Sequence, residues 1–164
     1  GADTNDVLPA ITYWLMGSLS FSTSSIVWNL TIPMLSGILI LIFFSKYLNA
    51  LSLGDEEAKA LGINTKLIKL IIIIVATLIS ALSVILAGII GWIGLIIPHI
   101  TRLIFGADNK VILPMSALIG AIFLLLVDNV SKLIFSFEIP IGIVTAIIGI
   151  PIFIFVLKNA KKGF

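Results

Sequence analysis

Few residues in this sequence could do chemistry, because charged side chains make up only 11% of its 164 residues and there is no cysteine. The single histidine, His99, follows Pro98 in a long apolar stretch. A zinc site needs three or four protein ligands, and no cysteine or carboxylate lies near His99 in the sequence. We therefore favour a structural role for His99, such as a hydrogen bond to a backbone carbonyl that Pro98 leaves free, over metal ligation.

No other pattern of residues indicates catalysis. The sequence has no glycine-rich phosphate-binding loop, no pair of carboxylates inside an apolar stretch, and no set of serine, histidine and aspartate. The net charge of +2 is too small to indicate nucleic-acid binding. The sequence therefore predicts no catalytic residue, no bound metal or other cofactor, and no nucleic-acid partner.

Two pairs of polar residues have helical spacing. Asp128 and Lys132 are four positions apart and can pair on one face of a helix, or Lys132 can be offered to a partner. Arg102 follows His99 by three positions, so the two residues would give a short helix a polar end. A positive charge there would stabilise the helix C-terminus.

Residues 54–62 are the most polar internal segment. Three acids, Asp55, Glu56 and Glu57, favour a helix start, and Gly62 is a typical residue just after a helix end. Asn64 then suits the N-cap of the next helix. The segment is interpreted either as a connector with solvated charges or as a protruding helix of about two turns that docks on a cytoplasmic partner. In the second case Ala58 and Leu61 would form the contact face, because residues three apart share a side.

The surrounding sequence is that of a membrane protein. Hydrophobic residues make up 60% of the chain, and no Asp, Glu, Lys or Arg occurs in residues 70–101, 111–127 or 139–157. About 20 apolar residues in a helix cross the hydrocarbon core of a bilayer. We therefore expect an all-α, polytopic membrane helical bundle. Its four main spans are expected at about residues 30–45, 67–87, 111–132 and 141–158.

Shorter elements are expected between and before these spans. Residues 70–101 are too many for one span, so we expect a turn near Gly88 and Gly91 and a short re-entrant helix at about 92–105. Residues 1–28 form an expected external segment, and residues 46–66 an expected loop on the other side. Glycines inside the helices permit close packing or breaks; these are Gly88, Gly91, Gly94, Gly142 and Gly149.

The basic residues predict the orientation of the chain in the membrane. When the loop of residues 46–66 lies in the cytoplasm, alternation of the spans puts nine of the ten basic residues on that side and only Lys132 outside. Cytoplasmic loops of membrane proteins carry an excess of Lys and Arg. We therefore expect a multi-pass protein of the cell (inner) membrane with a cytoplasmic C-terminus.

Two segments, LGDEEAKALG at residues 53–62 and GWIGLIIPHITR at residues 91–102, resemble the permease subunits of ABC importers for iron chelates (siderophores), haem or cobalamin. The first resembles their coupling loop and the second their most recognisable motif. Shorter similarities follow around Asp128 and at residues 13–19, 113–114, 138–145 and 149–153. The resemblance covers nearly the whole chain. It implies the C-terminal half of such a permease, beginning in the external loop after the fifth span.

The resemblance also implies roles for individual residues. Coupling to an ATPase subunit would involve Gly54, Asp55, Glu56, Glu57, Ala58, Leu61 and Gly62. Docking of an external substrate-binding protein would involve Lys132 and Glu138. The motif and the pathway would include Trp14, Gly91, Gly94, Pro98, His99, Arg102, Pro140 and Gly142.

The implied partners are a second permease subunit, identical or different, cytoplasmic ATP-binding subunits, an external substrate-binding protein and the lipid of the membrane. ATP hydrolysis would reside on the separate subunit, and the permease itself would not be an enzyme. Two alternatives remain, a fragment of an ion-coupled secondary carrier and a non-transporting membrane scaffold. A carrier usually buries ionisable residues near the middle of the bilayer, and these spans hold none apart from His99.

Overall fold

The computed structural model describes residues 7–19, 22–133 and 139–160, and all regular secondary structure in these residues is helical. Within these described residues, three helices are long and apolar enough to cross a membrane, namely α2, α4 and α6. The all-α membrane fold is thereby confirmed. The helices are α1 (Val7–Met16), α2 (Ser24–Leu51), α3 (Asp55–Ala60), α4 (Thr65–Ala87), α5 (Ile93–Phe105), α6 (Asn109–Leu133) and α7 (Ile141–Ala160).

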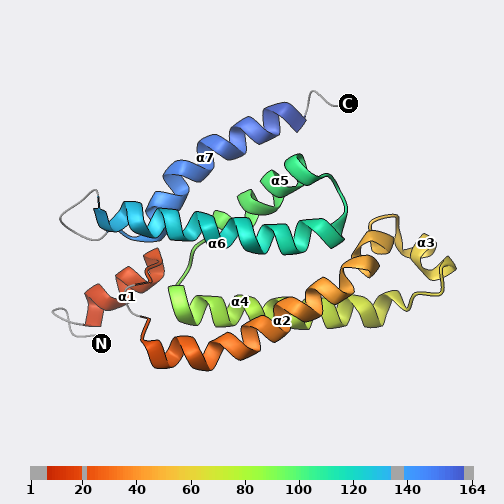
Figure 1. The fold of residues 1–164 in the computed structure, drawn as a ribbon, viewed down its shortest axis with the longest axis horizontal. Helices are drawn as coiled ribbons and strands as arrows, with labels where there is room; N and C mark the ends of the chain where they lie inside the picture. The colour runs from red at the N-terminus through yellow and green to blue at the C-terminus, as the bar shows by residue number, and fades with distance from the viewer. Residues whose placement is uncertain (1–6, 20–21, 134–138, 161–164) are drawn as a thin grey trace.

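The helices form two layers (Figure 1). One layer holds α2 and α4, which pack together, and the other holds α5, α6 and α7. The layers meet where α2 packs against α6. We call the end that carries α3, the end of α2 and the start of α6 the α3 end. The opposite end, which carries α1, the end of α4 and the start of α7, is the α1 end.

Local capping explains where two of the long helices begin. The backbone N–H of Leu67 donates to the side-chain oxygen of Asn64 over 3.2 Å, which confirms the expected N-cap of α4. The N–H of Ile26 donates to the hydroxyl of Thr23 over 3.4 Å, and this places the start of α2 at Ser24. These caps satisfy backbone donors that have no partner within the helix.

The expected and observed helices differ most at α2. Its 28 residues extend beyond the expected span of 30–45 at both ends. The expected span ended before Lys46, because a charged residue marks the edge of the hydrocarbon core. A helix can nevertheless continue past that edge into the polar interface. The fourth expected span corresponds to α7, which has 20 residues, and the expected short helix at 92–105 corresponds to α5.

The buried core of the described residues is small and lies mainly among α5, α6 and α7. Ile96, Ile112 and Val127 are each less than 5% exposed. A Cβ at Gly149 of α7 would press on Ile96 of α5, so the glycine allows these helices to approach closely. Many apolar side chains of α2 and α4 are exposed, such as Ile32 and Ile73. Such faces suit lipid or further transmembrane helices as neighbours.

Candidate functional site

The short helix α3 is closed at its C-terminus by a Schellman motif. The N–H of Ile63 donates to the carbonyl of Ala58 over 3.1 Å, and the N–H of Gly62 donates to the carbonyl of Lys59 over 2.8 Å. This motif requires a left-handed residue after the helix, and Gly62 has φ of 79°. Gly62 is therefore the C′ residue that the sequence predicts, and α3 ends in a defined turn.

The N-terminus of α3 carries the predicted acids. Gly54 is the N-cap residue, and the Glu57 carboxylate folds back toward it. Asp55 pairs with Lys69 of α4 over 2.6 Å, and Glu56 pairs with Lys59 within α3 over 2.7 Å. The acids lie in the first turn, where negative charge stabilises a helix. The Asp55–Lys69 pair fixes the direction of α3 relative to α4.

The two residues of the expected contact face have opposite environments. Leu61 is 67% exposed, whereas Ala58 is fully buried. The expectation that Ala58 contacts a partner is therefore wrong, because Ala58 faces the interior of the helix–loop segment. Leu61 remains available, together with the neighbouring Leu53, which is also exposed.

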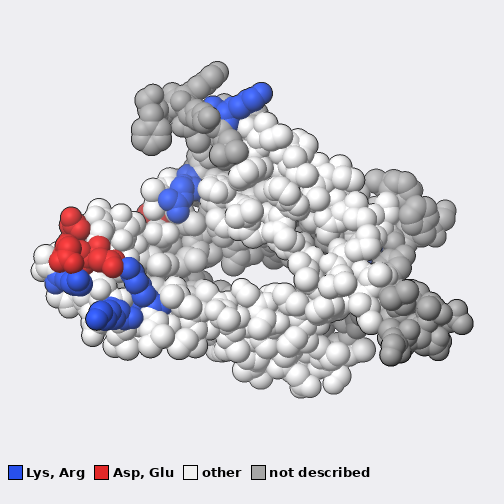
Figure 2. Space-filling model, turned by 180° about the vertical axis from the view of Figure 1, so that it is seen from behind, with Lys and Arg blue, Asp and Glu red and all other residues white. Residues whose placement is uncertain are grey.

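On the face that Figure 2 shows, most charged residues of the described chain lie toward the α3 end; the pair of Asp128 and Lys132 lies near the end of α6 instead. The acids of α3 lie there beside basic residues of α3 itself and of the start of α4. Arg102 lies in the last turn of α5, as the sequence predicts. The apolar middle of the molecule shows no charge on this face. This distribution is typical of a protein whose middle lies in lipid and whose α3 end lies in water.

A link that the sequence analysis missed also lies at the α3 end. The side-chain amide of Asn49, in the last turn of α2, donates to the Asp108 carboxylate over 2.6 Å. The side-chain oxygen of Asn49 accepts from the backbone N–H and the side-chain amide of Asn109, both over 2.8 Å. Asp108 precedes a helix and so has the sequence signal of an N-cap. No local signal identifies Asn49 as its partner, because 59 residues separate them.

The same contacts set the charge state of Asp108. The hydrogen bond from Asn49, followed by the one from the backbone N–H of Lys110, lowers the pKa of the Asp108 carboxyl. A carboxylate before the first turn of α6 also interacts favourably with the helix dipole. Asp108 is therefore an anion at neutral pH.

At the α1 end, the chain that follows α1 joins the two layers through backbone hydrogen bonds. The N–H of Ser18 donates to the carbonyl of Ala87 at the end of α4 over 3.0 Å. The N–H of Ile141 at the start of α7 donates to the carbonyl of Gly17 over 2.9 Å. We call these two bonds the outer joint. A side chain at Gly88 would clash with the Trp14 carbonyl, and one at Gly142 would clash with the Met16 carbonyl, so both positions need glycine.

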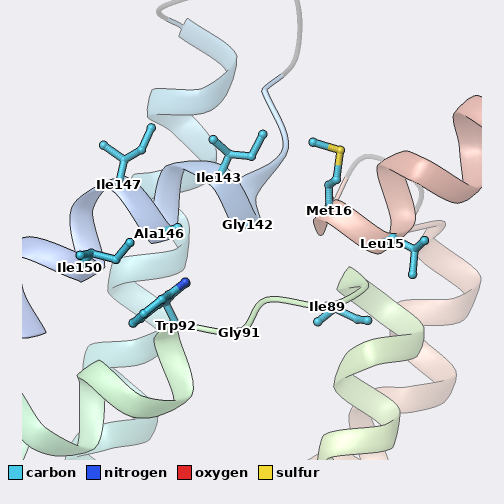
Figure 3. A pocket seen from close by; sticks show the side chains of 10 residues that line it. All are labelled: Leu15, Met16, Ile89, Gly91, Trp92, Gly142, Ile143, Ala146, Ile147 and Ile150. Atoms are coloured by element: carbon cyan, nitrogen blue, oxygen red, sulfur yellow. The ribbon is translucent and has the colours of Figure 1, made fainter.

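A groove of about 420 Å³ opens beside the outer joint, between α1, the turn after α4, and α7 (Figure 3). No charged side chain lines it. The indole of Trp92 forms part of its wall and packs edge-on against Phe153, with 6.4 Å between the ring centres. The lining residues share an apolar character and are Leu15, Met16, Ile89, Gly91, Trp92, Gly142, Ile143, Ala146, Ile147 and Ile150.

Two further cavities lie between α4 and the α5–α6 pair, with volumes of about 340 and 390 Å³. Gly94 borders both, and a Cβ there would meet no atom within 4 Å. A Cβ at Gly91 would likewise meet none. The expected close packing is therefore absent at Gly94 in the described chain, and Gly91 serves in the turn before α5 instead. The hydroxyl of Ser116 lines the larger cavity and has no hydrogen-bond partner among the described residues.

The other predicted residues have simpler surroundings. His99 is exposed, and its ring centre lies 6.1 Å from that of Phe153 in α7. The expected hydrogen bond from His99 to a backbone carbonyl is not found in the part of the chain that the structure describes, because the ring turns toward α7. Pro98 lies within α5, and Pro140 lies just before α7. No group of three or more metal-binding side chains occurs within residues 7–19, 22–133 and 139–160.

The predicted pair in α6 is confirmed. The ammonium group of Lys132 lies 2.8 Å from the Asp128 carboxylate, and Lys132 is the more exposed of the two side chains. The hydroxyl of Ser131 donates to the carbonyl of Ile139, which ties the end of α6 to the start of α7. Glu138, the other residue expected to dock a binding protein, lies outside the described residues.

Comparisons with known proteins agree with this architecture. The pattern of the FecCD transport family matches residues 2–159. The molybdate import system permease of Haemophilus influenzae is 41% identical over 99% of this chain and 48% of its own length. A probable iron chelatin transport system permease of Helicobacter pylori is 42% identical over 93% of this chain and 47% of its own length. The cobalamin import system permease of Halobacterium salinarum is 38% identical over 95% of this chain and 42% of its own length.

A solved structure shares the fold with a TM-score of 0.85 and 42% sequence identity. It is described as an inward-facing conformation of an ABC transporter assigned to the metal-chelate type. The match covers 96% of this chain and 51% of that chain. The chain therefore spans about half the length of the relatives that it matches.

Proposed function

Because the chain belongs to the FecCD transport family, we propose that it forms part of the membrane-spanning permease of an ATP-driven importer. The proposed cargo is an iron–siderophore complex or a related metal chelate such as haem or cobalamin. The relatives named for iron chelatin and cobalamin support this class of cargo. Another relative is named for the import of molybdate, a smaller anion.

The observation that carries this proposal is the exposed, rigidly capped helix α3. Its C-terminus is fixed by the Schellman motif at Gly62, and its N-terminus by the ion pair of Asp55 with Lys69. Leu61 projects from this fixed segment with 67% exposure. A short, rigidly held helix with exposed apolar side chains beside it suits docking into a groove on a cytoplasmic ATP-binding subunit. We propose that α3 is the coupling helix.

The proposed orientation follows from the placement of charge. The α3 end lies in the cytoplasm, because the basic residues gather there. The C-terminus then lies in the cytoplasm as well, and the α1 end faces outward. Lys132 lies toward the α1 end of α6 with its side chain 46% exposed, so it is offered to an external substrate-binding protein. Glu138 follows it in the sequence and is proposed for the same contact.

The groove beside the outer joint is the proposed outer part of the transport pathway. Its wall is apolar and holds no charged side chain, so it offers a large chelate a smooth surface without strong binding contacts. In this proposal a second permease subunit completes the pathway. ATP-driven closure of the ATPase subunits moves the α3 helices and reorients the spans, which gives alternating access.

The two rival functions are less well supported. An ion-coupled carrier typically places ionisable residues in the middle of its spans, whereas Asp128 and Lys132 lie in the last turns of α6. A non-transporting scaffold has no need for a capped, exposed helix between two spans.

The test is capture of the ATP-binding subunit by the complete permease that contains this chain. Leu61→Asp places a charge on the proposed docking surface and is expected to abolish capture. Leu133→Asp is the matched control, because Leu133 is also strongly exposed but lies at the opposite end of the molecule. Equal capture by the wild-type permease and both variants would refute docking through α3. Import that persists without ATP would favour the carrier instead.

A further inference from the structure

We infer that Asn49 and Asp108 are positioning residues that carry the displacement of α3 from the α2–α4 layer into the layer of α5, α6 and α7. This inference rests on the proposed function, because it assumes that an ATPase subunit moves α3. It goes beyond that function by naming the contact through which the motion reaches the wall of the groove.

The first step of the argument is the position of α3. It packs against α2 and α4, and its ion pair also runs to α4, so a displacement of α3 acts first on that layer. The groove wall, however, belongs largely to α7 and the segment before α5. A connection between the layers is therefore required, and it must lie close to α3 to follow its motion.

The contact between Asn49 and the start of α6 meets this requirement. Asn49 is three residues before the C-cap of α2, and the loop after that cap leads directly into α3. Its side-chain amide donates to Asp108, and its side-chain oxygen accepts from Asn109. Both polar atoms of one side chain thus hold the same helix terminus. Such a contact resists both separation and sliding of the two helices.

The chemistry of the contact makes it strong for an exposed site. Asp108 is ionised, and a hydrogen bond to a charged acceptor is shorter and stronger than one between neutral groups. The Asp108 carboxylate also accepts from the N–H of Lys110, while Asn49 accepts from the N–H of Asn109. Two of the backbone donors that α6 leaves without partners are therefore satisfied, one of them by a residue of α2.

Cavities separate part of the two layers, so the contacts at the ends of the helices can transmit motion from one layer to the other. The cavities between α4 and the α5–α6 pair leave that region loosely filled. Besides the packing of α2 on α6, hydrogen bonds join the layers at the outer joint at one end and at the Asn49–Asp108 contact at the other. Since helices are stiff, movement of α2 at the α3 end turns α6 about the outer joint. α5 and α7 pack against α6 and follow it.

The test uses the complete importer with a reporter in the groove. The chain has no native cysteine, so Ile147→Cys, made in a permease freed of other cysteines, provides one exposed thiol in the groove wall. The measurement is the ratio of maleimide labelling rates with and without a non-hydrolysable ATP analogue. In the otherwise wild-type complex this ratio is expected to differ severalfold from unity.

Three variants test whether the Asn49–Asp108 contact itself, rather than the general stability of the protein, transmits the motion. Asn49→Asp sets two carboxylates against each other and is expected to bring the ratio to unity while ATPase capture persists. The reciprocal double variant, Asn49→Asp with Asp108→Asn, restores a donor and an acceptor in exchanged positions and is expected to restore the ratio. Ser52→Ala is the matched control, because its hydroxyl is bonded only to the Asn49 carbonyl at the same end, and it is expected to behave as wild type.

The outcomes distinguish the inference from the proposed function. A wild-type complex without ATPase capture, or with a ratio of unity, contradicts the proposed function. A wild-type response that Asn49→Asp leaves unchanged overturns the inference alone. If Asn49→Asp misfolds and therefore no longer captures ATPase, the labelling ratios of Asn49→Ala and of the double variant decide whether the contact transmits the motion. A double variant that captures ATPase but shows no recovery of the ratio also overturns the inference.

Discussion

The ammonium group of Lys69 lies 2.6 Å from the carboxylate of Asp55, and this pair joins the start of α3 to the first turns of α4. Both side chains are about half exposed. An exposed ion pair contributes little to stability, because water and salt screen it. The ion pair instead orients α3, because it holds this six-residue helix at one angle to the membrane-spanning helix α4.

The first prediction concerns this ion pair. Lys69→Met is expected to lower the free energy of unfolding by less than about 1 kcal/mol, after allowance for solvent screening. It is expected to weaken ATPase capture more clearly, because α3 loses its fixed direction. Lys66→Met is the control, since Lys66 is exposed and makes no ion pair in the described residues. Equal weakening of capture by both variants would show that only the positive charge of this region matters.

The second prediction concerns the end of α3. Gly62→Ala forces a side chain into the left-handed region and is expected to cost about 1 kcal/mol locally. The amides of Gly62 and Ile63, which close the Schellman motif, are expected to exchange hydrogen faster in the variant. Gly91→Ala is the matched control, because a Cβ at Gly91 meets no atom within 4 Å. Unchanged exchange at residues 62 and 63 would contradict the role of the motif.

The third prediction concerns the outer joint. Gly142→Ala places a methyl group against the Met16 carbonyl and is expected to destabilise the protein by about 1–3 kcal/mol, the usual cost of overpacking. Thermal unfolding in detergent measures the change. Gly94→Ala makes the same substitution in open space and is expected to leave the unfolding temperature nearly unchanged. Similar losses in the two variants would show that close approach at Gly142 is not the cause.

The fourth prediction concerns the pH dependence of the Asn49–Asp108 contact. The hydrogen bond from Asn49 lowers the pKa of Asp108 in the folded protein. The stabilisation is therefore fully present above the unfolded pKa and is lost as the pH falls through the lower, folded pKa. Titration of the Asp108 carboxyl by carbon NMR is expected to give a midpoint below the ordinary range of an aspartate.

Asn49→Ala is the companion variant for this titration. Removing the largest cause of the shift is expected to raise the midpoint toward the ordinary value, while the remaining bond from the Lys110 N–H keeps part of the shift. An identical midpoint in the wild type and the variant would exclude Asn49 as the cause.

Features that depend on residues close in the sequence could be predicted. The N-cap at Asn64, the C′ residue at Gly62 and the pair of Asp128 with Lys132 each involve partners within four or five positions. Their spacing on a helix determines the contact, and no knowledge of the packing is needed. The all-helical membrane fold followed in the same way from the length of the charge-free runs, although three helices of the described residues, and not the four main spans expected, are long and apolar enough to cross a membrane.

Features that depend on packing between distant segments could not be predicted. The burial of Ala58 depends on how the loops around α3 fold over it, and the contact of Asn49 with Asp108 bridges 59 residues. The turning of His99 toward Phe153 depends on the packing of α5 on α7. The full length of α2 was not predicted either, because a charged residue marks the edge of the lipid but does not end a helix.

The outer joint has a consequence for how this part of the protein changes in evolution. Its hydrogen bonds run between backbone atoms of Ser18 and Ala87 and of Ile141 and Gly17. Every residue type except proline has the N–H that positions 18 and 141 supply. The two bonds themselves therefore exclude only proline at positions 18 and 141, whose side chains are both buried. At Gly88 and Gly142, in contrast, any side chain would block the approach of the α1 carbonyls. In this joint, two residues without a side chain are therefore as necessary as the residues whose backbone atoms form the bonds.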